Sequence, residues 1–419
     1  MRGIGVKARP AALTGRTNVN IVTRMKMLVI NWRCVRNPLA GGAEIYFQEI
    51  FRRLVRRGHD VTQLAERYPG SGPEEAIDGI RVVRMGGSNT FNFSVYRNLA
   101  ALVREGRYDI VIDDLNKVPF FSPWIVRDRP VLAILMHLFR GSIFKEALFP
   151  LASYVWLAET AIPLAYRSCR FAVLSESSKS DTVRVGIDPG RITVIPPGTD
   201  FERYRPRAGI ANDGSRSSDD GPRKPGPQSQ IDDRESQMPV VLHVGRLKKY
   251  KSTDHLLRAS RLLLDRGRKH RVVVVGTGDD LPRLEKLAGR LGLGDAVEFT
   301  GFVPEDEKLA WYRRAAVLSE NSVKEGWGLI VMEANGCGTP VVVADSPGLR
   351  DSSRDGVNGL VYPYGDVAAL AERLERLLGD DVLRRRLGTQ AVDWARQWTW
   401  DSAAEQMEAV INQAVAEAG

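Results

Sequence analysis

The sequence predicts an α/β protein made of two Rossmann-like domains whose parallel sheets face a central cleft. Short apolar strands alternate with helical patterns in both halves of the chain, and such strands are typical of parallel sheets covered on both faces. Between the halves, residues 204–238 are rich in Gly, Pro, Ser and charge, so they cannot build a core and are expected to form a flexible linker. A chain of 419 residues is long enough for two separate cores.

The first domain is expected over residues 25–203. Residues 1–24 are basic and lack the apolar run of a signal peptide, so we expect a disordered extension there. The expected strands cover 27–32, 61–65, 80–84, 108–113, 131–137, 171–175 and 192–196, with helices at 43–57 and 94–105.

The second domain is expected over residues 239–394. Residues 395–419 are expected to form a helix that packs back toward the first domain. The expected strands cover 239–245, 271–276, 297–301, 316–319 and 340–344, and the expected helices cover 253–266, 281–291, 330–336, 367–378, 381–396 and 401–416.

Composition narrows the class of protein. The three cysteines have no paired spacing, so the sequence predicts neither a disulfide framework nor a cysteine-based zinc site, and a reducing cytoplasmic location fits. The net charge is +9, and residues 1–204 hold 29 lysines and arginines against 19 acids. This excess favours an anionic partner, such as a phosphorylated acceptor, an acidic membrane or nucleic acid; a general basic bias explains it equally well.

Two segments raise the question of a membrane. Arg52, Arg53, Arg56 and Arg57 form a cationic patch beside apolar residues, which fits either a bilayer contact or the solvated face of a core helix. The apolar run 147–166 is interrupted by prolines and a glutamate, so it is expected to be a buried helix rather than a membrane span.

The stretch KEGWGLIVMEANGCGTPVV (324–342) carries the most chemistry. Glu325 and Glu333 are eight positions apart across a glycine-rich turn that opens an apolar helix, so both can point to one side. Gly326 and Gly328 allow backbone N–H groups to approach a ligand, and a helix N-terminus favours phosphate. Such glutamate pairs also occur as surface charge, but the apolar neighbours of Glu333 argue against a solvated position. A phosphate-binding turn with two nearby carboxylates, which can accept hydrogen bonds from sugar hydroxyls, suits a nucleotide sugar.

Other candidates lie where strands end, the edge at which open parallel sheets bind ligands. Gly41 and Gly42 precede a helix, in a turn that suits either phosphate approach or tight packing. His137 ends a strand and is a candidate hydrogen-bond donor or proton relay, or a structural histidine. Arg246 and Lys251 follow a strand and a glycine, so both could reach one pyrophosphate.

Two nucleotide-binding motifs fail at single positions. A P-loop would need glycine where Tyr250 stands, and a dinucleotide fingerprint beginning at Gly276 would need glycine at Leu281. His243, inside an apolar strand, is expected to be a core residue with a satisfied ring.

These segments resemble glycosyltransferase family 4, the group 1 glycosyltransferases: retaining enzymes that use nucleotide sugars and have the GT-B fold. The resemblance runs from Met25 to about Ala416. Its most specific block is EGWGLIVMEANGCGTPVVVADSPGLRDSSRDGVNGLVYPYGD (325–366), supported by VGRLKKYK (244–251), VVVVGTGDDLPRLE (272–285), VEFTGFV (297–303), VLSESSKSD (173–181) and ITVIPPGTD (192–200).

The resemblance implies roles for individual residues. Arg246 and Lys251 would hold the donor diphosphate, Glu325 would bind near the donor sugar, and Glu333 would bind the ribose hydroxyls. His137 matches a histidine that contacts the donor sugar. The other implied donor-side positions are Gly41, Gly42, Gly301, Phe302, Val303, Gly326, Trp327, Gly328 and Leu329. Asn116 and Lys117 would lie toward the acceptor, or are structural loop residues. Ser252 departs from the family pattern, in which glycine commonly follows the lysine, and the linker is longer than usual.

The expected function is transfer of a sugar from a UDP- or GDP-linked donor to an acceptor hydroxyl, with retention and without cofactor or metal. The acceptor would be a carbohydrate, a lipid-linked saccharide or a small molecule, and no nucleic acid is expected. The expected location is cytoplasmic, with possible peripheral contact at an anionic inner membrane face. The alternatives are another GT-B enzyme, such as a nucleotide-sugar epimerase, and a non-catalytic nucleotide-sugar-binding protein.

Overall fold

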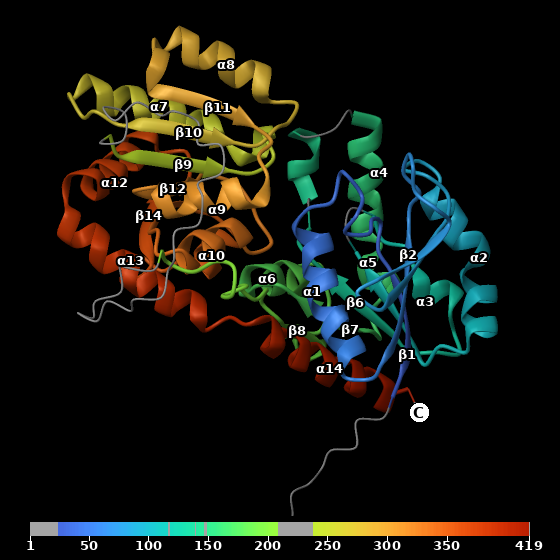
Figure 1. Cartoon of the computed structure of the whole chain (residues 1–419). Helices are drawn as coiled ribbons and strands as arrows, with labels where there is room; N and C mark the ends of the chain where they lie inside the picture. Colours follow the sequence, from blue (N-terminus) through green and yellow to red (C-terminus); the bar gives the residue numbers. More distant parts are fainter. Residues whose placement is uncertain (1–23, 116–117, 139, 146–148, 208–237, 419) are drawn as a thin grey trace, which may run out of the picture.

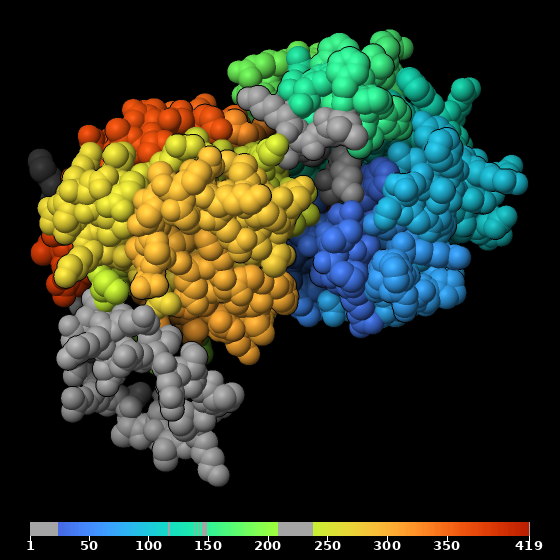
Figure 2. Space-filling view, turned by 90° about the horizontal axis from the view of Figure 1, so that it is seen from above, coloured from blue at the N-terminus to red at the C-terminus, as the bar shows by residue number. Residues whose placement is uncertain are grey.

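The structure is a computed structural model of the chain that describes residues 24–115, 118–138, 140–145, 149–207 and 238–418. It contains two α/β domains, coloured blue to green and yellow to red in Figure 1. Seen from above, the two domains form separate lobes with a groove between them (Figure 2). The expectations for residues 1–23, for Asn116 and Lys117 and for 208–237 of the linker lie outside the described residues.

The amino-terminal domain contains an eight-stranded sheet in the order β3-β4-β2-β1-β5-β6-β7-β8. Every pair is parallel except β3 with β4, an antiparallel edge that the sequence analysis missed. The strands are β1 (Lys26–Ile30), β2 (Asp60–Ala65), β3 (Glu74–Ile77), β4 (Ile80–Arg84), β5 (Ile110–Asp114), β6 (Val131–Leu135), β7 (Arg170–Val173) and β8 (Ile192–Val194).

Helices cover both faces of this sheet. One apolar cluster packs α1 (Gly42–Arg56) against the sheet, and a second packs α2 (Phe91–Gly106), α4 (Phe149–Thr160) and α5 (Ile162–Ala165) against the other face. The remaining helical segments of the domain are α3 (Ser122–Ile125), η1 (Arg140–Lys145), α6 (Glu176–Arg184) and η2 (Pro189–Arg191).

The carboxyl-terminal domain has a fully parallel six-stranded sheet in the order β11-β10-β9-β12-β13-β14. This doubly wound order places the ligand crevice beyond the carboxyl ends of the central strands. The strands are β9 (Val240–Val244), β10 (Arg271–Val275), β11 (Val297–Gly301), β12 (Val317–Glu320), β13 (Val341–Asp345) and β14 (Gly359–Pro363), of which β14 was not foreseen. The helical segments are η4 (Lys249–Lys251), α7 (Thr253–Asp265), α8 (Leu281–Arg290), η5 (Gly294–Ala296), α9 (Glu305–Arg314), α10 (Leu329–Gly336), α11 (Leu349–Ser352), α12 (Val367–Gly379) and α13 (Asp381–Arg396).

The last helix, α14 (Trp400–Ala416), crosses back and packs along α1 of the first domain (Figure 1). Its apolar side enters the same cluster as Tyr46 and Phe47 of α1. Its acids pair with the cationic patch, since Arg53 lies 2.9 Å from Asp401 and Arg57 lies 2.8 Å from Glu408. Two of the four arginines of the patch, Arg53 and Arg57, are therefore paired with α14 rather than facing an open surface.

The expectation of a buried helix over 147–166 is wrong for the part that the structure describes. The helix α4 buries only one side, through small residues such as Ala152 and Ala158. Its other side exposes Phe149, Leu157 and further large apolar side chains. An apolar sequence cannot by itself distinguish a core helix from an apolar surface helix. Within the described residues, no helix is both long and apolar enough to cross a bilayer.

Candidate active site

The site begins at the carboxyl end of β9, where the chain turns at Gly245. Arg246 follows and is exposed, and no carboxylate among the described residues forms an ion pair with it. Gly276 and Gly278 hold this turn, because a β-carbon on either would come within 2.0 Å of a backbone oxygen, of Gly245 and Leu247 respectively. Close backbone packing therefore explains these two glycines without a dinucleotide, and it leaves a guanidinium available to an anion.

Lys251 lies between two carboxylates. Its Nζ is 2.7 Å from Glu325 Oε1 and 3.5 Å from Glu320 Oε1. Burial alone would lower the pKa of Lys251, but the charges of Glu320 and Glu325 outweigh it and raise that pKa above its ordinary value. Conversely, burial would raise the pKa of Glu325, and the Lys251 ammonium more than offsets it, so this carboxyl stays ionised. Glu320 was not predicted, because its strand was expected to end one residue earlier.

Tyr250 lies among these charged groups. Burial and the charge of Glu325 raise the pKa of its phenol, while Lys251 and Arg246 both act in the opposite direction. Lys251 Nζ lies 5.8 Å from the centre of the Tyr250 ring and would lie 3.9 Å from a β-carbon on Gly245, the residue before Arg246, so the two cations share this turn.

His137 approaches this turn from the other domain, just beyond β6. Burial, together with the charge of Lys324, lowers the pKa of His137 to about 4, although Glu325 and Asp181 act against the shift. The imidazole is therefore neutral at physiological pH, which leaves it able to donate one N–H. Lys324 also forms an ion pair with Asp181 on α6, so the Glu325 loop is bound directly to the first domain.

The glycine turn of the first domain meets the second domain across the cleft. A β-carbon on Gly41 would lie 3.0 Å from Arg246 Nη2, and one on Gly42 would lie 3.3 Å from Leu329 Cδ1. The turn begins α1 without a side-chain cap, and the Glu44 carboxylate instead accepts a 2.7 Å hydrogen bond from Gly41 N–H. Small residues here allow the two domains to come close.

The turn that opens α10 has a conformational reason for its glycines. Gly328 has φ of 111°, in the left-handed region. A β-carbon on Gly326 would lie 3.1 Å from the Met136 carbonyl oxygen of the first domain. Trp327 is buried with its ring 5.1 Å from that of Trp398, so its side chain belongs to the core between the domains. The first backbone N–H groups of α10, from Leu329 onward, begin beside this turn.

Glu333, on α10, has the partners that its apolar neighbours require. Tyr312 donates a 2.7 Å hydrogen bond to Glu333 Oε2, and Lys308 Nζ lies 3.3 Å from the same oxygen. Both partners come from α9, which the sequence analysis did not identify. The other carboxylate oxygen has no partner among these contacts and remains available for hydroxyl groups.

The residues expected near the base behave differently from one another. Gly301 has φ of 72°, so it turns the chain as β11 ends. Phe302 is 83% exposed, whereas Val303 is buried in the core of the domain. Only Phe302 therefore offers a side-chain surface on which a base could stack.

Two further expectations concern residues near Lys251. His243 is a buried core residue, as expected, with its ring atoms 3.1 Å from the Ser319 carbonyl oxygen and 3.2 Å from Thr253 Oγ1. Ser252, which replaces the usual glycine, has φ of 48°. The position is thus one that glycine suits, and serine occupies it at some strain.

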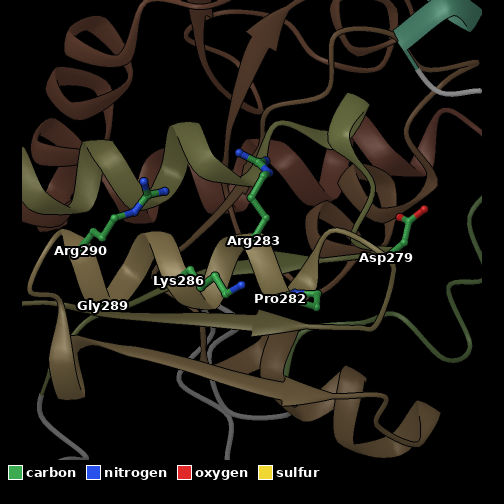
Figure 3. Close-up of a pocket in the computed structure, with 6 residues that line it drawn as sticks. All are labelled: Asp279, Pro282, Arg283, Lys286, Gly289 and Arg290. Carbon is green, nitrogen blue, oxygen red and sulfur yellow. The ribbon is translucent and has the colours of Figure 1, made fainter.

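A separate hollow lies on the outer surface of the second domain, along α8 (Figure 3). Its lining residues include Arg283, Lys286 and Arg290, but Arg283 is already paired with Asp280 and Asp254. None of the cleft residues lines it, so it is not the candidate active site.

Within the described ranges, no three histidine, cysteine or acidic side chains gather in an arrangement that could hold a metal ion. The expectation that no metal is needed stays a prediction.

Comparisons with known proteins agree on one family. The family model described as glycosyl transferases group 1 matches residues 228–394, and that described as glycosyltransferase family 4 matches residues 40–203. A D-inositol 3-phosphate glycosyltransferase from Thermomonospora curvata is 31% identical over 404 residues, which cover 88% of this chain and 89% of that protein. One from Nocardia farcinica is 37% identical over 393 residues, which cover 87% and 83%.

Solved structures share the architecture. Sucrose-phosphate synthase from Thermosynechococcus elongatus superposes with a TM-score of 0.76 at 22% identity, covering 94% of this chain and all of that one. HepE from Anabaena, in complex with UDP-glucose, gives a TM-score of 0.70 at 19% identity, with 93% and 100% covered. The chain therefore belongs to the family 4, or group 1, glycosyltransferases and has their GT-B fold.

Proposed function

We propose that this glycosyltransferase moves a sugar from a nucleoside-diphosphate sugar to an acceptor hydroxyl with retention at the anomeric carbon. One observation carries the proposal: an exposed Arg246 guanidinium, which pairs with no carboxylate among the described residues, lies on the same cleft rim as the Lys251 ammonium, opposite the Gly41 turn. A diphosphate is the donor fragment that two fixed cations and a helix N-terminus suit best.

The proposed chemistry is a same-face displacement. The bond between the anomeric carbon and the diphosphate oxygen breaks, the acceptor oxygen bonds to that carbon on the same face, and the acceptor proton passes to a departing phosphate oxygen. Negative charge grows on the diphosphate as this bond breaks, and preorganised cations stabilise it.

The surroundings suit each cation to that task. Lys251 has three N–H donors, and two carboxylates lie close enough to take two of them, so one remains for a phosphate oxygen. Arg246 needs no exchange of partners, since it has none among the described residues. Glu325 and the neutral His137 would contact the donor sugar, and Glu333 the ribose.

The relatives give a first choice of acceptor. Those described above are named for D-inositol 3-phosphate, and we extend a phosphorylated polyol to this chain as the first acceptor to try. The basic amino-terminal half fits such an acceptor, with a lipid-linked saccharide or another carbohydrate as the next choices. Three buried free thiols fit a cytoplasmic, reducing location.

Binding and turnover test this proposal together. UDP and GDP should each be titrated by calorimetry, and the corresponding sugar donors assayed with D-inositol 3-phosphate, with NMR of the product anomer. Arg246→Ala should lower transfer by about a hundredfold or more, the scale of one preorganised contact. Lys248→Ala is the matched control, because Lys248 is half-buried and its ammonium pairs with Asp279 instead. Wild-type transfer by Arg246→Ala, or loss of donor without any glycosylated product, would overturn the proposal.

A further inference from the structure

The amino-terminal domain carries an apolar surface that neither its core nor the cleft uses. Five large apolar side chains of α4 are between 41% and 75% exposed: Phe149, Leu151, Tyr154, Trp156 and Leu157. Soluble proteins seldom expose so many large side chains on adjacent turns unless the surface binds something. We call these five residues the α4 surface.

The α4 surface extends onto neighbouring elements. The ring of Phe144, on η1, lies 6.0 Å from that of Phe149. On α2, Tyr96 is 43% exposed, and partial burial together with the charge of the Tyr154 phenol raises the pKa of Tyr96. Phe93 precedes Tyr96 by three positions and is 75% exposed, so it shares that face of α2.

The position of α4 favours a partner with a flat surface over a ligand that binds in a groove. The helix stands at the end of the domain toward which β6 runs, and it projects beyond its neighbours (Figure 1). Its inward side uses the small residues Ala152, Val155 and Ala158, while the outward positions carry no charge. Its 12 residues extend about 18 Å, too short to cross a hydrocarbon core of about 30 Å.

The charges around the α4 surface indicate what kind of flat surface it contacts. In sequence, residues 91–106 and 138–160 contain Arg97, Arg104, Arg140 and Lys145 and three acids, Glu105, Glu146 and Glu159, of which Glu159 is buried on the inward side of α4. The described arginines among these are exposed. Tryptophan, tyrosine and phenylalanine with flanking arginines are typical of segments that lie in the interface of an anionic bilayer.

We propose that the α4 surface docks this protein onto an anionic lipid bilayer, with α4 lying in the headgroup region. This location differs from the cationic patch on α1, where α14 pairs with two of the four arginines. Because η1 and α4 follow directly after β6 and His137, docking holds the mouth of the cleft next to the lipid surface. The inference does not depend on which donor or acceptor the enzyme uses.

Co-sedimentation with vesicles tests the proposal on the full chain. Wild-type protein should pellet with phosphatidylglycerol vesicles and much less with phosphatidylcholine vesicles, and added salt should release it. The double variant Trp156→Asp, Leu157→Asp should lower partitioning by about tenfold or more, because two apolar contacts are lost and two negative charges are added. Val382→Asp is the matched control, since Val382 is 75% exposed on α13 of the other domain.

Two further measurements separate docking from misfolding and from self-association. Circular dichroism and UDP or GDP titration should be unchanged in the double variant, because both residues lie on the outward side of α4. Light scattering after size exclusion should give a monomer for both proteins. Equal pelleting of wild type and double variant would overturn the proposal, and so would a wild-type dimer that the double variant abolishes without any loss of vesicle binding.

Discussion

The carboxylate of Glu320 lies 3.5 Å from the ammonium of Lys251, buried at the end of β12 beneath the cleft. Ser322 donates a hydrogen bond to the same carboxylate oxygen. Glu320 approaches Lys251 from the buried end of β12, whereas Glu325 approaches it from the loop that precedes α10. We infer that Glu320 is a positioning residue, which acts on the reaction through Lys251.

Replacing Glu320 with glutamine should move the alkaline limb of the pH profile. Glu320 is one of the charges that raise the pKa of Lys251, so this lysine loses its proton only above the ordinary range. Without that charge the pKa falls, and kcat/KM should decline at a lower pH than in the wild type. The profile of Ser322→Ala, which keeps the charge, should stay near that of the wild type. An alkaline limb that does not move in Glu320→Gln would contradict the positioning role.

Adding one methyl group to the Gly41 turn should disturb the opposite domain. The new β-carbon would lie 3.0 Å from Arg246 Nη2, so the guanidinium has to shift. Gly41→Ala should therefore lower transfer by about threefold to tenfold, because the guanidinium has to move by a few tenths of an ångström and a misplacement of about 1 Å can cost about a hundredfold. Gly289→Ala is the control, because a β-carbon there meets no atom within 4 Å. Steady-state kinetics should show no change in that control.

Removing the Glu333 carboxylate should weaken nucleotide binding through the ribose. Glu333→Ala should cost about 1.5–3 kcal/mol, or roughly 10- to 150-fold in Kd for UDP or GDP. The loss should shrink with the 2′-deoxy nucleotide, which lacks one partner hydroxyl. The Tyr312→Phe variant keeps the Glu333 carboxylate, so it should bind UDP or GDP more tightly than the Glu333→Ala variant does. Calorimetry that gives equal losses for the ribose and deoxyribose ligands would rule out the ribose contact.

The contact between α1 and α14 should make stability depend on pH at the acid end. Burial would raise the pKa of Glu408, but hydrogen bonds from His59 and Arg57 lower it below its ordinary value. Its stabilising contribution is therefore complete above the unfolded pKa and is lost as the pH falls through the folded one. At pH 7, Glu408→Gln should cost about 1.5–3 kcal/mol, and the difference from wild type should vanish in acid.

Urea unfolding at pH 7 and pH 3 measures that difference. Glu405→Gln is the comparison, because the Glu405 side chain is 64% exposed and its ion pair with Arg57 should contribute about 0–1 kcal/mol. Equal losses for the two variants at pH 7 would contradict the contribution assigned to Glu408.

The alternation of apolar strands and helices predicted two α/β domains with parallel sheets, and the family resemblance predicted the GT-B fold; the structure confirms both. The alternation did not predict β3, because this four-residue edge strand begins with Glu74 and Glu75 and is mostly exposed. An edge strand buries too little to require an apolar sequence. The sequence also failed to predict the exposed side of α4, because a helix with no charged residue at its outward positions has the pattern of a core helix.

At the site, the sequence predicted functional residues that follow the strands. It did not predict the residues that contact and position those functional side chains. Lys251 and Glu325 lie 2.7 Å apart, and Arg246 follows β9 on the same side of the domain, while the roles of all three at the donor stay predictions. Glu320, Lys308 and Tyr312 were missed because their relation to the site arises only when segments distant in sequence pack together. Trp327, a motif position expected beside the donor, has its side chain in the core between the domains, and its donor contact stays a prediction.

The contact of α14 with α1 also bears on how the protein is made. Residues such as Met407 and Ile411 fill the same cluster as Tyr46 and Phe47. A ribosome therefore completes the whole second domain before it releases the helix that closes the first. Until then, the part of the α1 cluster that α14 covers stays exposed on the nascent chain, and a truncated product ending near residue 396 would leave that part exposed permanently.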